Sequence, residues 1–275
     1  MTKMKDEQIT SVQNARVKRL LLLQQKSAER RAAGLFVMEG QRELHHCLAA
    51  GYEADSLFYC PEYSGVEDWL HAHPQVSSAL RFSVSAPVYE RMAYRGSTEG
   101  VVALVRERRQ SLADLQLSPS PLIVVVERVE KPGNLGAILR SADAAKADAV
   151  IVCNPLTDLY NPNLIRSSIG AVFTVPTVAT TTEACIAFLR QHDIRILTAQ
   201  LQDSSLYYDT DMRQPTAIVM GTEATGLTDQ WRQAADAHIR IPMLGQLDSL
   251  NVSVSAAILL FEAVRQRQAA GLTKG

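Results

Sequence analysis

The sequence lacks any long apolar segment. Its purely apolar runs are short, as at residues 20–23 and 122–126, and far below the roughly 20 residues that a membrane-spanning helix needs. The first ten residues contain no apolar core, so we expect no signal peptide. These features predict a cytoplasmic protein with no membrane partner.

Closely spaced cysteines are also missing. The four cysteines, at positions 47, 60, 153 and 185, form no CxxC pair and have no histidine at metal-ligand spacing. A zinc site draws on several such ligands at short spacing. We therefore expect free thiols in a reducing compartment and no metal site.

The chain has no excess of one charge. Its 28 Lys and Arg residues and 29 Asp and Glu residues give a formal net charge of −1, so any nucleic-acid surface must be local. The first 31 residues are a basic exception, because eight basic residues there accompany only three acidic ones. With the apolar run at 20–23 they predict an amphipathic helix with a basic outer face. That face is either solvated or in contact with phosphate.

The first hundred residues alternate short strands and helices. Strands are expected at 35–40, 56–60, 80–85 and 101–107, and helices at 41–51, 66–73 and 86–95. This pattern predicts a small αβ domain over residues 1–107, followed by a proline-containing linker at 108–121. No carboxylate pair and no nucleophile with a base stands out in the domain, so we interpret it as a binding module.

From Leu122 the alternation resumes with more apolar strands. Strands are expected at 122–127, 148–153, 171–178, 195–200, 216–221 and 238–243, and helices at 134–146, 161–169, 181–191, 227–235 and 252–268. Near-continuous apolar strands separated by helices predict an α/β domain over 122–275 with a parallel sheet covered on both faces. Ligands of such sheets bind at the carboxyl ends of the strands.

Two of the loops after these strands combine glycine with polar residues. In the first, Asn134 is placed to cap a helix, and Arg140 lies in the first turns, where the helix dipole disfavours a cation. In the second, Gly221 and Gly226 flank Glu223, which could pair with Arg140. Neither loop contains the G-x-G-x-x-G pattern of dinucleotide-binding folds, which argues against a nucleotide-dependent oxidoreductase.

A third loop precedes the last helix. It places Ser249 and Asn251 at the entry of a helix whose centre, 256–261, is apolar on every side. A helix that is apolar all round is expected to be buried. Its polar entry therefore predicts either an ordinary N-cap or one wall of a binding site.

The three loops together resemble the motifs of a known enzyme family. NLGAILR at 134–140, GTEATGL at 221–227, and IPM at 241–243 followed by DSLNVS at 248–253 are similar, in order and spacing, to the three motifs of the SpoU (TrmH) ribose 2′-O-methyltransferases. Residues 1–107 are similar to the ribosomal-protein-L30e-like substrate-binding domain of many members. The nearest resemblance is to the ribosomal RNA branch that includes the thiostrepton-resistance methyltransferases.

The resemblance implies a knotted α/β fold (SPOUT) with a deep trefoil knot, and a homodimer packed through the knotted domain with the RNA site shared between subunits. It also implies bound S-adenosylmethionine. The implied cofactor contacts are Thr198, Ala199, Gly221, Ile241, Met243, Leu250 and Asn251.

The resemblance also implies the catalytic roles. Arg140 would stabilise developing negative charge or, if a phosphate assists, act as the base, and Glu223 would orient it. Asn134, Ser249 and Asn251 would position the nucleotide and the cofactor. Arg42 and Arg95, at loops of the first domain, are the candidate RNA contacts. The position of Lys146 is often glycine in the family.

Three functions remain open at this point. A separate first domain favours ribosomal (23S) RNA as the substrate, with transfer RNA as the alternative. A non-catalytic RNA-binding protein that retains the fold is a further alternative, although the presence of all five polar motif residues argues against it. No metal is required for any of these.

Overall fold

The computed structural model describes residues 6–93, 99–222 and 225–272. The chain divides into two compact units, one of residues 1–109 with 160–166, the other of residues 110–159 with 167–275. Arg95 and Glu223 lie outside the described residues. No helix in the described part is long and apolar enough to cross a membrane.

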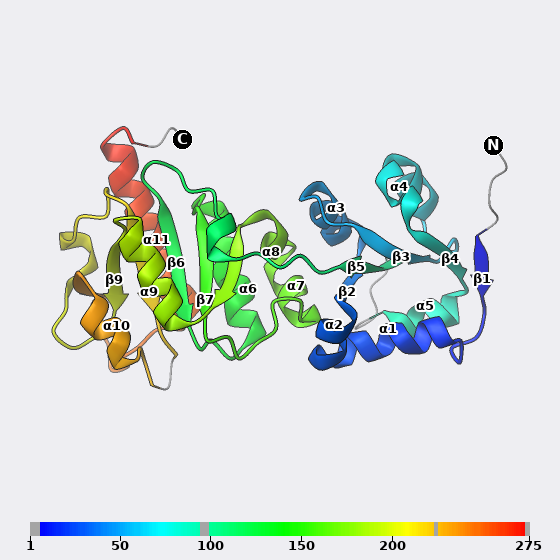
Figure 1. The fold of residues 1–275 in the computed structure, drawn as a ribbon, viewed down its shortest axis with the longest axis horizontal. Coiled ribbons are helices and arrows are strands. Elements are labelled where there is room, and N and C mark those ends of the chain that lie inside the picture. The colour runs from blue at the N-terminus through cyan, green and yellow to red at the C-terminus, as the bar shows by residue number, and fades with distance from the viewer. Residues whose placement is uncertain (1–5, 94–98, 223–224, 273–275) are drawn as a thin grey trace. The chain divides into compact units, whose positions relative to one another are not determined.

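The first unit is built on a five-stranded mixed sheet in the order β1-β4-β3-β5-β2 (Figure 1). Its strands are β1 (Glu7–Ile9), β2 (Leu35–Glu39), β3 (Ala54–Tyr59), β4 (Leu80–Val84) and β5 (Val101–Arg106), and its helices are α1 (Ala15–Gln25), α2 (Ser27–Ala33), α3 (Gln41–Ala49), α4 (Val66–Ala72) and α5 (Ala86–Met92), with a 3₁₀ turn at Pro74–Ser78. The sequence correctly predicted β2 to β5 and missed β1, a three-residue edge strand paired with β4.

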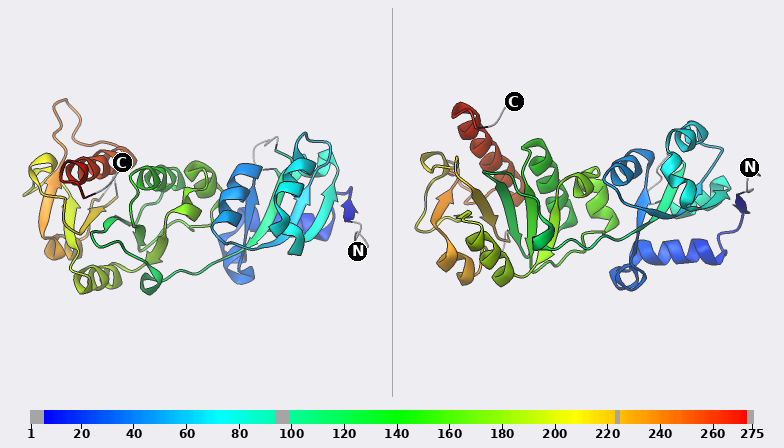
Figure 2. Two further views of the ribbon diagram at one scale, coloured as in Figure 1. Left: turned by 90° about the horizontal axis from the view of Figure 1, so that it is seen from above. Right: turned by 45° about the horizontal axis from the view of Figure 1, so that its top comes forward.

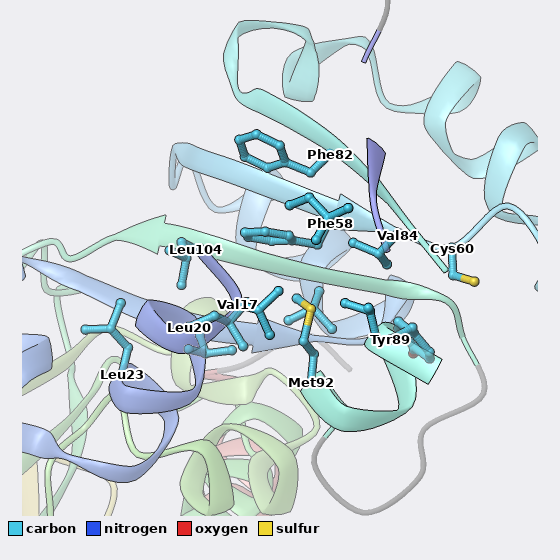
Figure 3. Packing of buried hydrophobic residues seen from close by; sticks show 14 of the residues in the cluster. Val17, Leu20, Leu23, Phe58, Cys60, Phe82, Val84, Tyr89, Met92 and Leu104 are labelled. Atoms are coloured by element: carbon cyan, nitrogen blue, oxygen red, sulfur yellow. The ribbon is translucent and has the colours of Figure 1, made fainter. Parts of the chain in front are cut away.

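The core of this unit lies between the sheet and helices α1 and α5. Val17, Leu20 and Leu23 on α1 pack with Tyr89 and Met92 on α5 against the sheet (Figure 3). The apolar run at 20–23 therefore serves a helix, as predicted, with Leu20 and Leu23 facing inward. The opposite, basic side of α1 faces solvent.

The second unit contains a seven-stranded parallel sheet in the order β10-β12-β9-β11-β6-β7-β8. Its strands are β6 (Leu122–Glu127), β7 (Ala149–Cys153), β8 (Thr177–Thr180), β9 (Arg195–Ala199), β10 (Ser205–Leu206), β11 (Thr216–Met220) and β12 (Ala237–Arg240). The predicted parallel sheet is confirmed, and the two-residue edge strand β10 was not anticipated.

Helices cover both faces of this sheet, as its apolar strands require. They are α6 (Pro132–Ala144), α8 (Ala171–Thr174), α9 (Thr182–Gln191), α10 (Asp229–Ala234) and α11 (Val252–Ala269), and the unit also has 3₁₀ turns at Leu112–Asp114 and Tyr207–Asp209. Most of helix α7 (Pro162–Ser168) lies in the segment 160–166, which belongs to the first unit. Figure 2 shows α6 and α11 side by side on one face, and α9 and α10 on the other. The four cysteines are free and buried, as expected.

Two local predictions were wrong. The segment 171–178 was expected to be one strand, but Ala171–Thr174 forms α8 and only Thr177–Thr180 joins the sheet. The pattern of a short apolar run does not distinguish a helix from a strand. Pro176 favours an extended backbone at Val175, which ends the helix there. Asn134 was expected to cap α6, but the N-cap is Lys131, and Pro132 takes the first helical position, which suits proline.

Arg267 ties the end of α11 to the start of the sheet. Its side chain is only 4% exposed, and it donates hydrogen bonds to the carbonyl oxygens of Met212, Ser120, Pro121 and Gln214 at 2.7–3.1 Å. Burial lowers the pKa of this guanidinium from its usual value. These four carbonyls precede β6 and β11, so one side chain fixes where both central strands begin.

We expect Arg267→Met to destabilise the protein by about 3 kcal/mol, because buried carbonyls would lose their donors. Urea unfolding of Arg265→Met is the matched control. Arg265 is exposed and paired with Glu262, so its loss should cost less than about 1 kcal/mol. Equal midpoints for the two variants would contradict the role given to Arg267.

Candidate functional site

The order of the central strands places a ligand-binding edge between β6 and β11. The chain passes from β6 to β7 and β8 on one side, and β11 and β9 lie on the other side. In parallel α/β sheets, ligands bind where the direction of strand order reverses, at the carboxyl ends of the strands. Here that edge holds the segments that follow Glu127 and Met220.

A cavity of 430 Å³ opens at this edge, within the size range of small-molecule sites. It is lined by residues that follow β9, β11 and β12 and by the first turns of α11. Of the residues predicted from the sequence, it contains Ala199, Gly221, Ile241, Met243, Ser249 and Leu250. The structure thus brings together most of the implied cofactor contacts.

A second cavity of 140 Å³ adjoins the first and shares Gly221, Thr222 and Val252 with it. Asn134 of α6 lines this smaller space. The Asn251 side-chain amide donates a hydrogen bond to Asn134 Oδ1 at 3.2 Å. The first and third motifs therefore meet beside the smaller cavity.

Asn251 is also the N-cap of α11. Its Oδ1 accepts hydrogen bonds from the backbone N–H of Ser253 at 3.0 Å and from the Ser253 hydroxyl at 2.6 Å. The two interpretations of this helix entry are therefore compatible: the oxygen of Asn251 caps the helix while its amide nitrogen reaches α6.

Gly221 is required by the tight turn of the second motif. A Cβ atom on this residue would lie 2.2 Å from the carbonyl carbon of Gly226. The turn is closed by a hydrogen bond from Gly226 N to Thr222 O at 3.0 Å and by the Thr222 hydroxyl, which accepts from Thr225 N. Glu223 falls within this turn but outside the described residues, so its pairing with Arg140 stays a prediction.

Thr198 does not line either cavity. It is fully buried, and its hydroxyl lies 2.6 Å from Nδ1 of His238 on the neighbouring strand β12. Thr198 thus links β9 to β12 directly below Ala199. In this structure it supports the cavity wall and does not form it.

Arg140 is exposed on α6 and lines neither cavity. It follows Asn134 by six residues, about 9 Å along the helix and about 240° around its axis. No hydrogen bond or ion pair holds its guanidinium within the described ranges. In a single chain the exposed Arg140 therefore lies outside the two cavities that contain Asn134 and Ser249.

Glu127 is a site-supporting residue that the sequence patterns did not single out. It is 1% exposed, and its carboxylate accepts hydrogen bonds from the hydroxyls of Thr182 and Thr228 and from Thr228 N, at 2.7–2.9 Å. It therefore fixes the starts of α9 and α10 at the binding edge. An acidic residue at the end of the apolar strand LIVVVE was the available signal.

Comparisons with known proteins agree with this geometry. Residues 121–261 match the family model described as the SpoU rRNA Methylase family. The chain belongs to the SpoU family. Residues 14–103 match the model of an MRM3-like substrate binding domain. The resemblance inferred from the three motifs is thus confirmed.

Relatives of this SpoU protein span nearly its whole length. The 23S rRNA (uridine(2479)-2′-O)-methyltransferase of Streptomyces viridochromogenes is 30% identical over 267 residues, covering 94% of this chain and 92% of the relative. An AdoMet-bound rRNA methyltransferase from Sinorhizobium meliloti aligns with a TM-score of 0.85 and 30% identity, over 94% and 97% of the two chains. An RNA 2′-O ribose methyltransferase structure is 40% identical, with a TM-score of 0.81 over 95% and 99%.

We expect Gly221→Ala to lower thermal stability by several degrees, because the added methyl group overlaps the Gly226 backbone. Gly133→Ala is the matched control. Gly133 lies in α6, where an added Cβ would have no neighbouring atom within 4 Å and φ is not positive, so alanine there should be neutral or stabilising. Equal melting temperatures of Gly221→Ala and the wild type would show that the turn relaxes freely.

Proposed function

We propose that this SpoU protein transfers the methyl group of S-adenosylmethionine to the 2′-hydroxyl of a ribose in ribosomal RNA. The observation that carries the proposal is the pair of adjoining cavities at the carboxyl edge of the sheet. The larger has room for a nucleoside cofactor, and the smaller contains Asn134 next to Asn251. Family membership supports the methyltransferase activity.

The larger cavity fits S-adenosylmethionine by its chemistry. Leu227, Ile241 and Leu259 give it an apolar surface for a ring system. Gln200, also in its lining, has a buried Oε1 atom with no hydrogen-bond partner in the described part of the chain, and such an acceptor is costly unless a donor reaches it. When bound, the cofactor supplies an electrophilic methyl group on a sulfonium.

The acceptor ribose would lie in the smaller cavity. Asn134 and Asn251 would position its hydroxyls, and the backbone at Gly221 and Thr222 would form the boundary with the cofactor. Holding the two reactants in line supplies much of the acceleration of such a displacement. With the cofactor bound, an oxygen–carbon bond would form as the carbon–sulfur bond breaks, and the hydroxyl proton would leave to solvent or to a substrate phosphate.

Arg140 would stabilise the negative charge that develops on the ribose oxygen. A guanidinium is not deprotonated in proteins, so we assign it this electrostatic role in preference to that of a base. Because Arg140 lies outside the cavities of its own chain, we propose that it serves the site of a second copy. Glu223 would orient it there.

An exposed apolar stripe supports the homodimer. Val254 and Phe261 are 46% and 48% exposed and lie on one side of α11, seven residues apart. Leu244, Leu247 and Leu250, in the loop before the helix, are 96%, 80% and 38% exposed. The last helix was expected to be buried on every side. In one chain it is buried on the side that packs against α6 and β11, with Val252, Ala256, Leu259, Leu260, Ala263 and Arg267. The stripe is the surface that a second copy would cover.

We also infer the deep trefoil knot of the SPOUT fold, in which the segments after β11 and β12 and the helix α11 thread through one loop. The return of residues 241–251 to the edge already occupied by 221–227 supports this inference. An experimental structure whose ends could be drawn apart without a knot would refute it.

Residues 1–107 would be the RNA-binding domain, of the L30e-like type, with Arg42 and Arg95 among its contacts. Arg42 is exposed in the first turn of α3. The relatives that match this chain along nearly all of its length are named as rRNA enzymes, which favours ribosomal over transfer RNA. Action on ribosomal RNA would place the enzyme in the cytoplasm.

We expect Arg140→Ala to slow methyl transfer about 100-fold or more, because transition-state charge would lose its stabilising cation, with cofactor affinity nearly unchanged. The measurement uses tritiated S-adenosylmethionine and total RNA from cells lacking the gene, with calorimetry for cofactor binding. Arg213→Ala is the control, since Arg213 is an exposed arginine paired with Asp211 before the start of β11.

Normal turnover of Arg140→Ala would reject its catalytic role. Label in transfer RNA would favour the alternative substrate. Cofactor binding without any labelled RNA from the wild type would favour a non-catalytic RNA-binding protein.

A further inference from the structure

Two of the basic residues near the N-terminus are accounted for by contacts within the first unit. Arg16 pairs with Glu7 at 3.1 Å and lies 4.5 Å from the centre of the Phe82 ring. Arg30 is 4% exposed and donates to the carbonyl oxygens of Leu23 and Gln24, at the corner between α1 and α2. These two arginines hold the helices in place.

Three other cations, on α1 or at its end, have no such role, whereas the exposed Arg31 lies in the last turn of α2, where the helix dipole favours a cation. Lys18, Arg19 and Lys26 are exposed, and none forms an ion pair within the described residues. We call these three residues the α1 basic face. Helix geometry places them within about 100° of one another around α1.

Helix stability does not explain the α1 basic face. Lys18 and Arg19 lie near the start of α1, whose first turn has no acidic residue, and Lys26 is the N-cap of α2 without a side-chain cap bond. The dipole of α1 does not stabilise a cation at Lys18 or Arg19, and Lys26 is both the C-cap of α1, where the dipole favours a cation, and the N-cap of α2, where it does not. Local helix electrostatics therefore do not account for Lys18 and Arg19, and their charges are available to an external anion.

The face is also held rigidly. Gln24 donates to the carbonyl oxygen of Met92 on α5 at 2.6 Å, and Arg30 fixes the following corner. A phosphate ligand would meet cations whose helix is already ordered, which reduces the entropy cost of binding.

A lipid surface does not fit this helix. Its apolar side, with Val17, Leu20 and Leu23, is packed in the core of the unit (Figure 3), and only Leu22, 37% exposed, offers apolar surface among the cations. Interfacial helices bind membranes with a free apolar face. A polyanion with a solvated backbone fits better.

We propose that Lys18, Arg19 and Lys26 form a docking face for the phosphate backbone of the RNA substrate, distant in sequence from the methyl-transfer motifs. The proposal rests on the proposed function, which makes RNA the substrate. The match to a substrate binding domain begins at residue 14, the N-cap of α1, so this helix belongs to the matched module. The face recognises backbone charge and not base identity.

The test compares the triple variant K18Q/R19Q/K26Q with a control that loses the same charge. Glutamine has a helix propensity close to that of lysine and arginine, and circular dichroism would check folding. The control is R106Q/R213Q/R265Q, since each of these exposed arginines has its own carboxylate partner. Binding of a fluorescein-labelled RNA hairpin is measured by anisotropy over a range of KCl concentrations, and methylation with in vitro transcribed 23S rRNA.

We expect the triple variant to lower the slope of log Kd against log salt by about two, as expected for three lost phosphate contacts. KM for RNA should rise about tenfold or more, while kcat and S-adenosylmethionine affinity stay at wild-type values. The control should keep the wild-type slope.

An unchanged slope in the triple variant would overturn the proposal that this face binds RNA. An acidic protein would then be the better candidate for its partner. An equal fall in the control would also overturn it, because net charge alone would then explain the loss. If the wild type bound the hairpin but did not methylate RNA, the proposed function would be overturned. The salt slopes of the triple variant and its control would still test the docking face.

Discussion

The insertion of β11 between β6 and β9 is the constraint on which the rest of the molecule depends. It makes β6 the point where the strand order turns from one direction to the other. Parallel pairing then brings the segments after β6, β9, β11 and β12 to one edge, where their loops must share space. The starts of β6 and β11 are fixed by the buried Arg267, and their ends by Glu127 and the Gly221 turn.

That edge gives two kinds of surface from one set of loops. The turn at Gly221 packs closely against Gly226, which leaves no room for a side chain. Gly221 and Thr222 line both cavities. Asn251 caps α11 with its oxygen and reaches Asn134 with its nitrogen. A local requirement of helix formation thus also sets the distance between two sequence motifs that are far apart along the chain.

The parallel sheet and the three polar loops could be predicted from the sequence, because polar residues and glycines follow otherwise apolar strands. The parallel sheet followed from strands such as LIVVVE, and the three loops from their glycines and amides. The strand order was not accessible, since periodicity carries no information on which strands are neighbours. The motif resemblance predicted seven cofactor contacts, five of which line the larger cavity.

The remaining differences have physical causes. Thr198 was placed in the cavity wall, but side chains alternate between the faces of a strand, and its neighbour Ala199 reaches the cavity instead. The α8 segment was expected to be a strand because buried apolar residues suit either state. Arg140 follows Asn134 by six residues on α6 and lies outside both cavities of its own chain, and this position is the reason that we propose a second copy at each site.

The most direct test of this shared site uses a heterodimer of two inactive chains, Arg140→Ala and Asn251→Ala, co-expressed with different tags and purified through both. If Arg140 serves the partner's cavities, one of the two sites in each heterodimer has a complete set of side chains. We then expect about half of the wild-type methylation rate, as two-fold symmetry implies. No activity above that of the two parent variants would contradict the shared site, because Arg140 and Asn251 would then have to act within one chain.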